Sequence, residues 1–485
     1  MTNAKVLEPA SVWYYFKELC KVPRPSFKTQ RVQQWLLDFA AEHRLEAVRD
    51  QVGNVIIRKA ASAGMENARP VILQGHMDMV CEKNSDVEHD FDKDPIDYYV
   101  EDDWMTARGT TLGADNGIAV AMMLALLADD TLRHGPVECL FTADEEVGLI
   151  GASGIEPGVL RGKTLINLDN EDDHWLCIGC AGGINTVAKF PFETEAAPAG
   201  HYYFRLGISG LQGGHSGTDI NVGRGNANQL LVRFLYEENQ QQPVQLAQFQ
   251  GGNLSNAIPR EAWCVAAVPF EGKEKLRARL NHFEAALQDE FGQLEPNLTL
   301  TLESVEAPAE ILKKAYADRF LAAIYACPNG VIRMNKDMPD QVDTSTNLAS
   351  VKPSDGQAHE WTIVTSQRSS IETSKIDVVN RVRAIFELAG MSTYHNEGYP
   401  GWKPNADSPL LKLMVDVHRG LFGEDPTVYS IHAGLECGLF LEKYPDWDMV
   451  SIGPTMRGVH SPDEKLYVPS VGNIWRYLVA ILEHM

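Results

Sequence analysis

The sequence lacks a long hydrophobic run and has comparatively few basic residues. Its longest apolar stretch, residues 118–128, has 11 residues, whereas a membrane-spanning helix needs about 18 or more. Residues 1–9 contain no apolar core of a secretory signal. Lys and Arg number 43 against 66 Asp and Glu, which gives a net charge of −23 at pH 7. Such a surface disfavours nucleic acid and anionic lipid as partners and favours metal cations. The sequence therefore predicts a cytoplasmic protein that binds neither nucleic acid nor a membrane.

Cysteine motifs and phosphate-binding loops are also scarce. The eight cysteines are scattered along the chain, and Cys177 and Cys180 form a single C-x-x-C pair. A zinc knuckle would need a second pair with similar spacing, so we expect reduced, mostly buried thiols. The sequence contains no phosphate-binding loop of the P-loop type, which argues against a phosphoesterase.

What the sequence does contain is a repeated pattern of short apolar runs that end in polar residues. Alternation of such runs with helical patterns predicts an α/β fold, in which ligands collect at the carboxyl ends of the strands. We expect residues 118–128 to form a helix capped by Asp115. The three apolar runs, each read as a buried strand, are Val71–Gly75 before His76, Val137–Thr142 before Asp144–Glu146, and Thr164–Leu168 before Asp169.

The 485 residues suggest two or three domains. Composition changes near Gly182, and polar motifs are sparse until residue 398, where strand and helix patterns resume. We therefore expect residues 1–182 and 398–485 to form one domain with a central mixed sheet. Residues 183–397 are expected to form a second α/β domain inserted into it. Whether this insert is internally duplicated stays open, because no clear repeat is visible.

Histidine and carboxylate side chains at these positions point to a metal site. Imidazole and carboxylate are good zinc ligands, and two metals can share a bridging carboxylate. Asp115 suits the bridge because each of its two oxygens can take one metal. Cobalt and manganese accept the same ligand set. The five candidate ligands are His76, Asp115, Glu146, Asp169 and His460.

Two further carboxylates have candidate roles beside the metals. Asp78 lies two residues after His76, so on a strand the two side chains share a face and the carboxylate can fix the imidazole. Glu145 and Glu146 are adjacent, so one can bind metal while the other acts as a general base on a metal-bound water. A purely structural metal site has no use for such a free carboxylate, so hydrolysis is favoured over a scaffold role.

The ordered set of motifs resembles the co-catalytic zinc exopeptidase and deacylase family, which includes carnosinases, peptidase V and aminoacylase. Within that family the chain is most similar to the bacterial aminoacyl-histidine dipeptidase subgroup, also called peptidase D or cytosol nonspecific dipeptidases. The family motifs are Gly75–Asp78, Gly113–Gly117, Asp144–Gly148, Asn167–Asp169 and Gly458–His460. The subgroup motifs are Gly213–Gly217, Asn256–Arg260 and His432–Gly438.

The resemblance implies a zinc-exopeptidase-like catalytic domain with an inserted lid and dimerisation domain, and two zinc ions per subunit. One zinc would take His76 and Asp169, the other Glu146 and His460, with Asp115 bridging. Glu145 would be the general base, and Asp78 would hold the His76 ring. The relatives form homodimers in which the lid of one chain reaches the metals of the other.

Four more residues are candidates for binding the substrate or its transition state. His215 lies between glycines and, on the family match, could donate to the developing oxyanion. Arg368 and Asn256 could bind a terminal carboxylate, for which a guanidinium is well suited. Glu436 is a further substrate-binding candidate. The alternatives without a function are a turn histidine for His215, a surface ion pair for Arg368 and a helix-face carboxylate for Glu436.

The resemblance implies hydrolysis of dipeptides with unblocked termini, among them Xaa-His dipeptides such as carnosine. The family tends to carry Asp at the position of Asp169 in dipeptidases and aminopeptidases, and Glu in carboxypeptidase-like members and deacylases. Asp169 therefore favours a dipeptide substrate. The alternative that stays open is an N-acyl amino acid deacylase with the same metal site.

Overall fold

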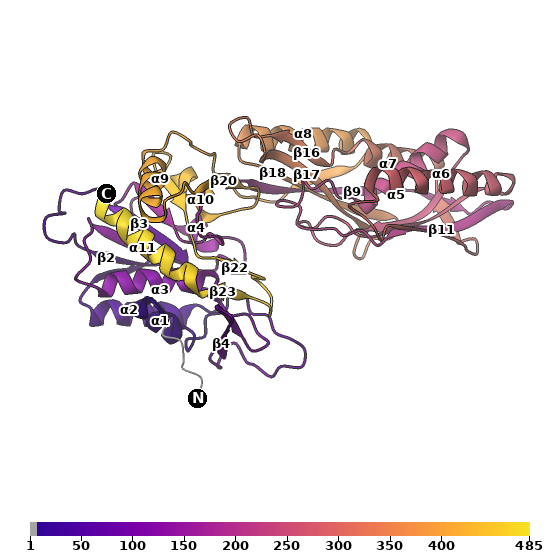
Figure 1. Cartoon of the computed structure of the whole chain (residues 1–485). Helices are drawn as coiled ribbons and strands as arrows, with labels where there is room; N and C mark the ends of the chain where they lie inside the picture. Colours follow the sequence, from indigo (N-terminus) through magenta and orange to yellow (C-terminus); the bar gives the residue numbers. More distant parts are fainter. Residues whose placement is uncertain (1–6) are drawn as a thin grey trace. The chain divides into compact units, whose positions relative to one another are not determined.

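The computed structural model describes residues 7–485, which divide into two compact units. Unit 1 contains the chain up to Cys180, together with Trp402–Ser430 and Leu435–Met485. Unit 2 contains Ala181–Gly401 and the short segment Ile431–Gly434. Unit 2 is thus formed mainly by one continuous stretch that interrupts unit 1 (Figure 1).

The centre of unit 1 is an eight-stranded mixed sheet with the order β1-β2-β6-β3-β7-β21-β8-β20. Strand β3 pairs in parallel with β6 and β7, whereas β1 and β2 are antiparallel to their neighbours. The mixed α/β sheet predicted from the sequence is confirmed. The strands are β1 (Glu46–Arg49), β2 (Val55–Lys59), β3 (Val71–His76), β6 (Val137–Thr142), β7 (Thr164–Asn167), β8 (Trp175–Cys180), β20 (Thr427–Ile431) and β21 (Asp448–Ser451).

The parallel pairing sets which residues meet at one edge of this sheet. His76 at the end of β3 is paired with Thr142 at the end of β6. Gln74 on β3 is paired with Asn167 at the end of β7. Because parallel strands end at the same edge, the polar residues that follow β3, β6 and β7 are brought together there.

Helices cover the sheet of unit 1 and complete its core. Helix α3 is apolar on all sides and can therefore be buried among its neighbours. Tyr477 of α11 donates a hydrogen bond to the carbonyl of Met414 on α9 over 2.7 Å, which ties these two helices together. The helices are α1 (Ala10–Leu19), α2 (Gln30–Glu42), α3 (Ala114–Ala128), α4 (Ile150–Gly154), α9 (Pro409–Phe422), α10 (Glu436–Lys443) and α11 (Val468–His484).

The start of α3 differs from the sequence-based expectation. Gly113 is the capping residue, and both Asp115 and Asn116 have non-helical backbone angles. Asp115 makes no capping bond, because each of its oxygens faces a histidine instead. The prediction that Asp115 caps this helix is therefore wrong.

A small four-stranded sheet with the order β22-β23-β5-β4 accompanies the main sheet of unit 1. Its strands β23 and β22 flank the loop that carries His460 and Glu464. The strands are β4 (Tyr98–Glu101), β5 (Trp104–Ala107), β22 (Met456–Arg457) and β23 (Lys465–Tyr467).

Unit 2 is built on an antiparallel sheet with the order β14-β11-β13-β12-β17-β18-β9-β19, and β16 pairs with β17. Figure 1 shows the helices of this unit along one face of the sheet, and their apolar sides form the core of the unit. A separate pair joins β10 (Thr194–Ala196) to β15 (Glu310–Leu312). The sheet strands are β9 (Gly182–Pro191), β11 (His201–Ser209), β12 (Gln245–Gly251), β13 (Ala262–Pro269), β14 (Thr299–Ser304), β16 (Gly330–Met334), β17 (Val342–Pro353), β18 (Glu360–Ser369) and β19 (Ser392–His395). The helices are α5 (Ala227–Gln241), α6 (Lys273–Phe291), α7 (Lys314–Ala326) and α8 (Glu372–Leu388).

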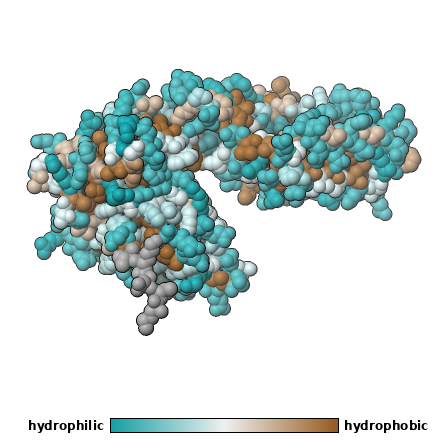
Figure 2. Space-filling view, in the orientation of Figure 1, coloured by the Kyte–Doolittle hydropathy of each residue, from teal (hydrophilic) through white to brown (hydrophobic). Residues whose placement is uncertain are grey.

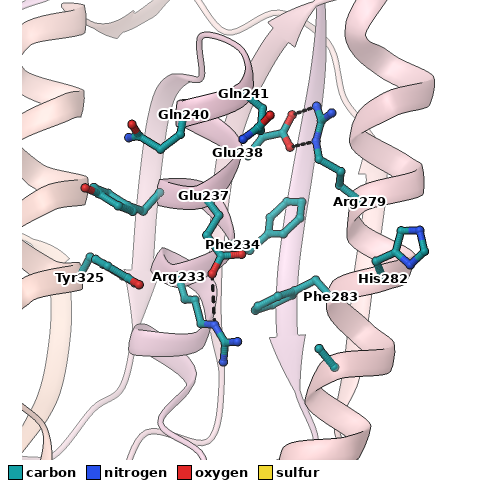
Figure 3. A pocket seen from close by; sticks show the side chains of 12 residues that line it. Arg233, Phe234, Glu237, Glu238, Gln240, Gln241, Arg279, His282, Phe283 and Tyr325 are labelled. Carbon is teal, nitrogen blue, oxygen red and sulfur yellow. Dashed lines mark hydrogen bonds and ion pairs between the residues drawn. The ribbon is translucent and has the colours of Figure 1, made fainter.

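A cavity of about 510 Å³ lies between α5, α6 and α7 (Figure 3). On one wall, Arg279 makes two hydrogen bonds of 2.5 Å to the buried carboxylate of Glu238. On another, the rings of Tyr236 and Tyr325 are stacked with centroids 4.4 Å apart. These contacts join α5 to α6 and to α7.

Hydrophilic side chains cover most of the visible face of each unit, and apolar residues appear there as scattered patches (Figure 2). Within residues 7–485, no helix combines the length and apolar character that crossing a bilayer would require.

Candidate metal centre

The five candidate ligands of unit 1 lie in a continuous chain of contacts. Nε2 of His76 is 3.6 Å from Oδ1 of Asp169 and 3.0 Å from Oδ1 of Asp115. Nε2 of His460 is 3.2 Å from Oδ2 of Asp115 and 3.0 Å from Oε2 of Glu146. The two oxygens of Asp115 therefore face two different histidines.

These side chains come from loops and strand ends at one edge of the main sheet. His76 is the last residue of β3, and Asp169 lies two residues after the end of β7. Glu145 and Glu146 lie in the turn after β6, beyond the strand itself. The expectation that they stand at the strand end is therefore only approximate.

Asp78 connects the His76 ring to the turn that carries the two glutamates. Its Oδ1 lies 3.4 Å from Nδ1 of His76 and accepts the backbone N–H of Glu145 over 3.0 Å. Its Oδ2 accepts the Ser26 hydroxyl over 2.8 Å and the backbone N–H of Glu146 over 3.3 Å. Outer partners of this kind orient a ligand imidazole.

Glu464 is a buried residue that the sequence reasoning missed. Its side-chain oxygens accept four consecutive backbone N–H groups, from Leu112 to Asp115, over 2.8–3.2 Å. This carboxylate thereby fixes the turn that presents Asp115. Its only sequence signal was its position four residues after His460.

Arg24 is a second missed residue, and it is 2 % exposed. Its guanidinium donates to the carbonyls of Met77 and Asp78 and to that of Gly113. It therefore joins the segment after His76 to the segment before Asp115.

The electrostatics of the site favour a bound cation. Burial would lower the pKa of His76, but the carboxylates of Asp169 and Asp115 outweigh it and raise that pKa well above its usual value. Burial raises the pKa of Glu145 well above its usual value, and the neighbouring carboxylate of Glu436 adds to this shift. Buried carboxylates in such numbers need compensating positive charge.

The donor set also fits a divalent metal. Suitable ligand atoms of His76, Asp115 and Glu146 lie within 4.8 Å of one another. Oε1 of Glu146 is buried and has no hydrogen-bond partner among the described residues. Imidazole and carboxylate are ligands that zinc accepts. These residues thus form a candidate metal site.

Glu436, the first residue of α10, is buried beside this site. Its Oε2 accepts hydrogen bonds from Gln74 over 2.5 Å and from Thr142 over 2.8 Å. Its Oε1 is buried without a partner among the described residues. Burial raises the pKa of Glu436 to about 7. Glu436 is therefore a buried carboxylate at the start of a helix.

His215, Asn256 and Arg368 belong to unit 2. Nδ1 of His215 accepts the backbone N–H groups of Gly217 and Thr218 over 3.3 and 3.1 Å. The ring proton of the neutral imidazole must therefore be on Nε2. Burial, aided by the charge of Arg368, lowers the pKa of His215 to about 4, which keeps the ring neutral. His215 is thus a neutral N–H donor.

Arg368 lies near the end of β18 and is 7 % exposed. Its Nη1 donates to the Tyr399 hydroxyl over 2.8 Å, while its buried Nε has no partner among the described residues. Arg368 is therefore not part of a surface ion pair. Asn256 is exposed, and its backbone carbonyl accepts the backbone N–H of Ser216, the residue after His215.

Sequence comparison identifies the family. The sequence profile of peptidase family M20/M25/M40 matches residues 72–484. The chain belongs to this family. The M20 peptidases hydrolyse peptide bonds, so the family, fold and enzyme class predicted from the sequence are confirmed.

Two relatives match this M20 peptidase over its whole length. The cytosol non-specific dipeptidase of Escherichia coli (strain K12) is 43% identical over 485 residues, which cover 100% of this chain and 99% of the relative. The crystal structure of aminoacylhistidine dipeptidase from Vibrio alginolyticus is also 43% identical, with a TM-score of 0.92, and the match covers 99% of this chain and 97% of that one. A tripeptidase from Staphylococcus aureus, at 14% identity and a TM-score of 0.57, shares the fold alone.

The C-x-x-C pair plays no part in the candidate site. Cys177 and Cys180 are both buried, and none of the eight cysteines is in a disulfide. Burial raises the pKa of Cys180 to about 12, which opposes a reactive thiolate. Seven of the eight cysteines are buried and Cys81 is partly buried, which agrees with the expectation of mostly buried thiols.

Proposed function

We propose that this M20 peptidase is a dipeptidase that uses two zinc ions to hydrolyse dipeptides with free termini. Xaa-His dipeptides such as carnosine are among its substrates. The observation that carries the proposal is the placement of Asp115, whose Oδ1 and Oδ2 face His76 and His460 respectively. One carboxylate between two histidines is the arrangement that a bridging ligand needs.

The remaining ligands divide around this bridge. Asp169 lies beside His76, and Glu146 lies beside His460, so each half has one imidazole and one further carboxylate. When bound, divalent ions lower the pKa of an attacking water and polarise the amide carbonyl. Cobalt and manganese fit the same donors.

Glu145 is the general base of the proposed reaction. Asp78 accepts its backbone N–H over 3.0 Å, which holds Glu145 in place next to the proposed ligand Glu146. In the reaction Glu145 takes the proton of the attacking water and passes it to the leaving amine. Positive charge at the neighbouring ligands restores its ionised form against the effect of burial.

The free amino terminus of the substrate is recognised by Glu436. Its Oε1 is buried without a partner among the described residues, so it has hydrogen-bonding capacity to satisfy. An ammonium group supplies both a donor and the opposite charge. An N-acyl substrate lacks that charge.

Arg368 and Asn256 recognise the terminal carboxylate, and His215 acts on the scissile carbonyl. Nη1 of Arg368 already donates to the Tyr399 hydroxyl, whereas Nε has no partner among the described residues and is available for a carboxylate oxygen. The neutral His215 ring offers its Nε2–H to the oxygen that becomes negative in the transition state.

The names of the relatives support the substrate class. Both full-length relatives at 43% identity are named as dipeptidases, one of them for aminoacyl-histidine substrates. The N-acyl amino acid deacylase is not favoured, since neither relative is named as one. The Escherichia coli relative is named for the cytosol, which supports a cytoplasmic enzyme. We further propose a homodimer in which unit 2 supplies His215 to the partner subunit.

A single reconstitution experiment tests the proposal. The enzyme is stripped with a chelator, reloaded with zinc, cobalt or manganese, and assayed with β-alanyl-histidine, other dipeptides and N-acetyl amino acids. Dipeptide hydrolysis should return when two ions per chain are bound. Full activity with one ion or none would refute the two-metal site, and faster cleavage of N-acetyl amino acids would establish the deacylase.

A further inference from the structure

Two histidines of unit 1 lie together outside the candidate metal centre. His174 immediately precedes β8, and His418 lies in the last turns of α9. Nδ1 of His174 is 3.0 Å from Nε2 of His418. The carboxylate of Glu424, just beyond α9, places Oε1 3.7 Å from the same Nδ1 of His174. Neither histidine has a role in the proposed hydrolysis.

We propose that His174, His418 and Glu424 form a second, peripheral site for a divalent cation of the zinc type. Zinc–nitrogen bonds of about 2.0–2.1 Å at a tetrahedral centre place two ligand nitrogens about 3.3–3.4 Å apart. The two ring nitrogens need to separate by only a few tenths of an ångström to reach that spacing. The exposed Glu424 side chain must also rotate, because its carboxylate lies near Nδ1 of His174 but not near Nε2 of His418. Two imidazoles and one carboxylate, completed by water, are a ligand set that zinc accepts.

The outer partner of the His418 ring matches that of a metal-binding histidine. Nδ1 of His418 donates to the backbone carbonyl of Glu424 over 2.9 Å, which leaves the lone pair on Nε2. Nε2 of His174 lies 3.6 Å from Oδ2 of Asp173. Ligand histidines characteristically give their second nitrogen to a carbonyl or a carboxylate, as His418 does, whereas the His174–Asp173 distance is too long for a hydrogen bond.

The surroundings keep His418 neutral and leave a path for an ion. His418 is 1 % exposed and contacts the rings of Phe422 and Tyr477. Burial lowers its pKa, so its Nε2 is unprotonated at neutral pH. The side chains of His174 and Glu424 are 34 % and 68 % exposed, so the site opens to solvent on their side.

A cation here would cross-link two segments of unit 1. His174 ends the loop that begins after β7 and carries Asp169, while His418 and Glu424 flank the end of α9. Asp173 already anchors that loop by accepting the Thr455 hydroxyl over 2.6 Å. The expected effect is therefore on stability, and the peptide-bond chemistry does not use this site.

The alternative is a metal-free hydrogen bond in which Nδ1–H of His174 donates to Nε2 of His418. The two states differ in whether a proton or a cation lies between the nitrogens. Nitrogen-15 NMR of the imidazole rings distinguishes them, because zinc must displace the proton from Nδ1 of His174.

The experiment measures zinc content and thermal unfolding of the full-length enzyme after equilibration with zinc. His174→Ala and Glu424→Gln are compared with wild type, because their exposed side chains can be removed without opening the core. His484→Ala, which removes an exposed histidine from α11, is the matched control. We expect His174→Ala to lose about one equivalent of zinc and the zinc-dependent rise in Tm, while dipeptide hydrolysis is retained.

This comparison does not depend on how many ions the catalytic centre holds, since only the difference between variants counts. Equal zinc content in wild type and His174→Ala would overturn the proposal. So would a wild-type spectrum in which Nδ1 of His174 stays protonated at saturating zinc. Loss of the equivalent in His484→Ala as well would also count against it, because the effect would then not be specific to this cluster.

Discussion

The backbone N–H of Asp115 donates a hydrogen bond to Oε1 of Glu464 over 3.2 Å, although 349 positions separate the two residues. Three neighbouring N–H groups, from Leu112 to Ala114, donate to the same carboxylate. The turn that presents the proposed bridging ligand is therefore held by a residue from the far end of the chain.

Replacing Glu464 should loosen this turn. In Glu464→Gln, the side-chain amide would face two backbone donors that have no acceptor left. Leaving buried donors unsatisfied costs about 1–3 kcal/mol. We expect a fall of that size in the free energy of unfolding in urea, together with weaker metal binding. Glu483→Gln, at an exposed position of α11, is the control, and an equal loss in both variants would contradict the role of Glu464.

Substitutions of the adjacent residues Glu145 and Glu146 should have different effects on turnover and on metal content. Glu145→Gln removes the proposed base but none of the metal ligands, so both ions should remain while kcat falls about 10²–10⁴-fold. Glu146→Gln removes a ligand, so metal content should fall first. Metal analysis and steady-state kinetics on both variants check this. Near-normal turnover in Glu145→Gln would exclude it as the general base.

The sequence predicted the parts of the site that depend on local patterns. Apolar runs ending in His76 and before Asp169 are signals of buried strands, and the sheet places their ends at one edge. Arg24 and Glu464 could not be found in this way, because isolated charged residues have no local pattern and act through contacts more than 50 and 340 positions away. The backbone at Asp115 was mispredicted for a related reason. Helix-capping rules describe local bonding, whereas its oxygens are engaged by distant histidines.

Capture of the terminal carboxylate by Arg368 should appear as a difference between substrates. Arg368→Ala should slow hydrolysis of a free dipeptide by about 1.5–3 kcal/mol in kcat/KM, the scale of a charged hydrogen bond. The amide of the same dipeptide should be a poor substrate of wild type and be affected much less by the substitution. Tyr399→Phe, which removes the hydrogen-bond partner of Nη1, should lower kcat/KM for the free dipeptide by the equivalent of about 0.5–1.5 kcal/mol. Equal wild-type rates for the dipeptide and its amide would rule this out.

Acid should destabilise the protein through two histidines of unit 2. Burial, followed by the charge of Arg368, lowers the pKa of His215 to about 4 and that of His432 to about 3. The unfolded chain, with an ordinary histidine pKa of 6.5, takes up these protons first as the pH falls. Their contribution to stability is therefore fully present above pH 6.5 and is lost as the pH falls toward about 4 for His215 and about 3 for His432.

Each of these histidines adds at most about 1.4 kcal/mol per pH unit to the slope of unfolding free energy over that range. Urea unfolding between pH 7 and pH 4.5 measures the slope. His215→Gln should make it shallower, whereas His484→Ala, at the exposed end of α11, should not. An unchanged slope in His215→Gln would show that its ring does not titrate with a lowered pKa.

The last prediction concerns which subunit His215 serves. It lies in unit 2, whereas the proposed metal ligands and Glu145 lie in unit 1. If His215 acts on the metal centre of the partner subunit, Glu145→Ala and His215→Ala chains should each be nearly inactive alone. After mixing and subunit exchange, half of the dimers are mixed, and each mixed dimer has one site with both residues intact. Activity should therefore recover to about a quarter of the wild-type value. As a control for mixing, His484→Ala exchanged with Glu145→Ala should give about half of wild-type activity whichever subunit supplies His215, because half of the sites then lack Glu145 and all have His215. Absence of recovery, with exchange demonstrated by mass spectrometry of differently tagged chains, would place His215 in the site of its own chain or outside the reaction.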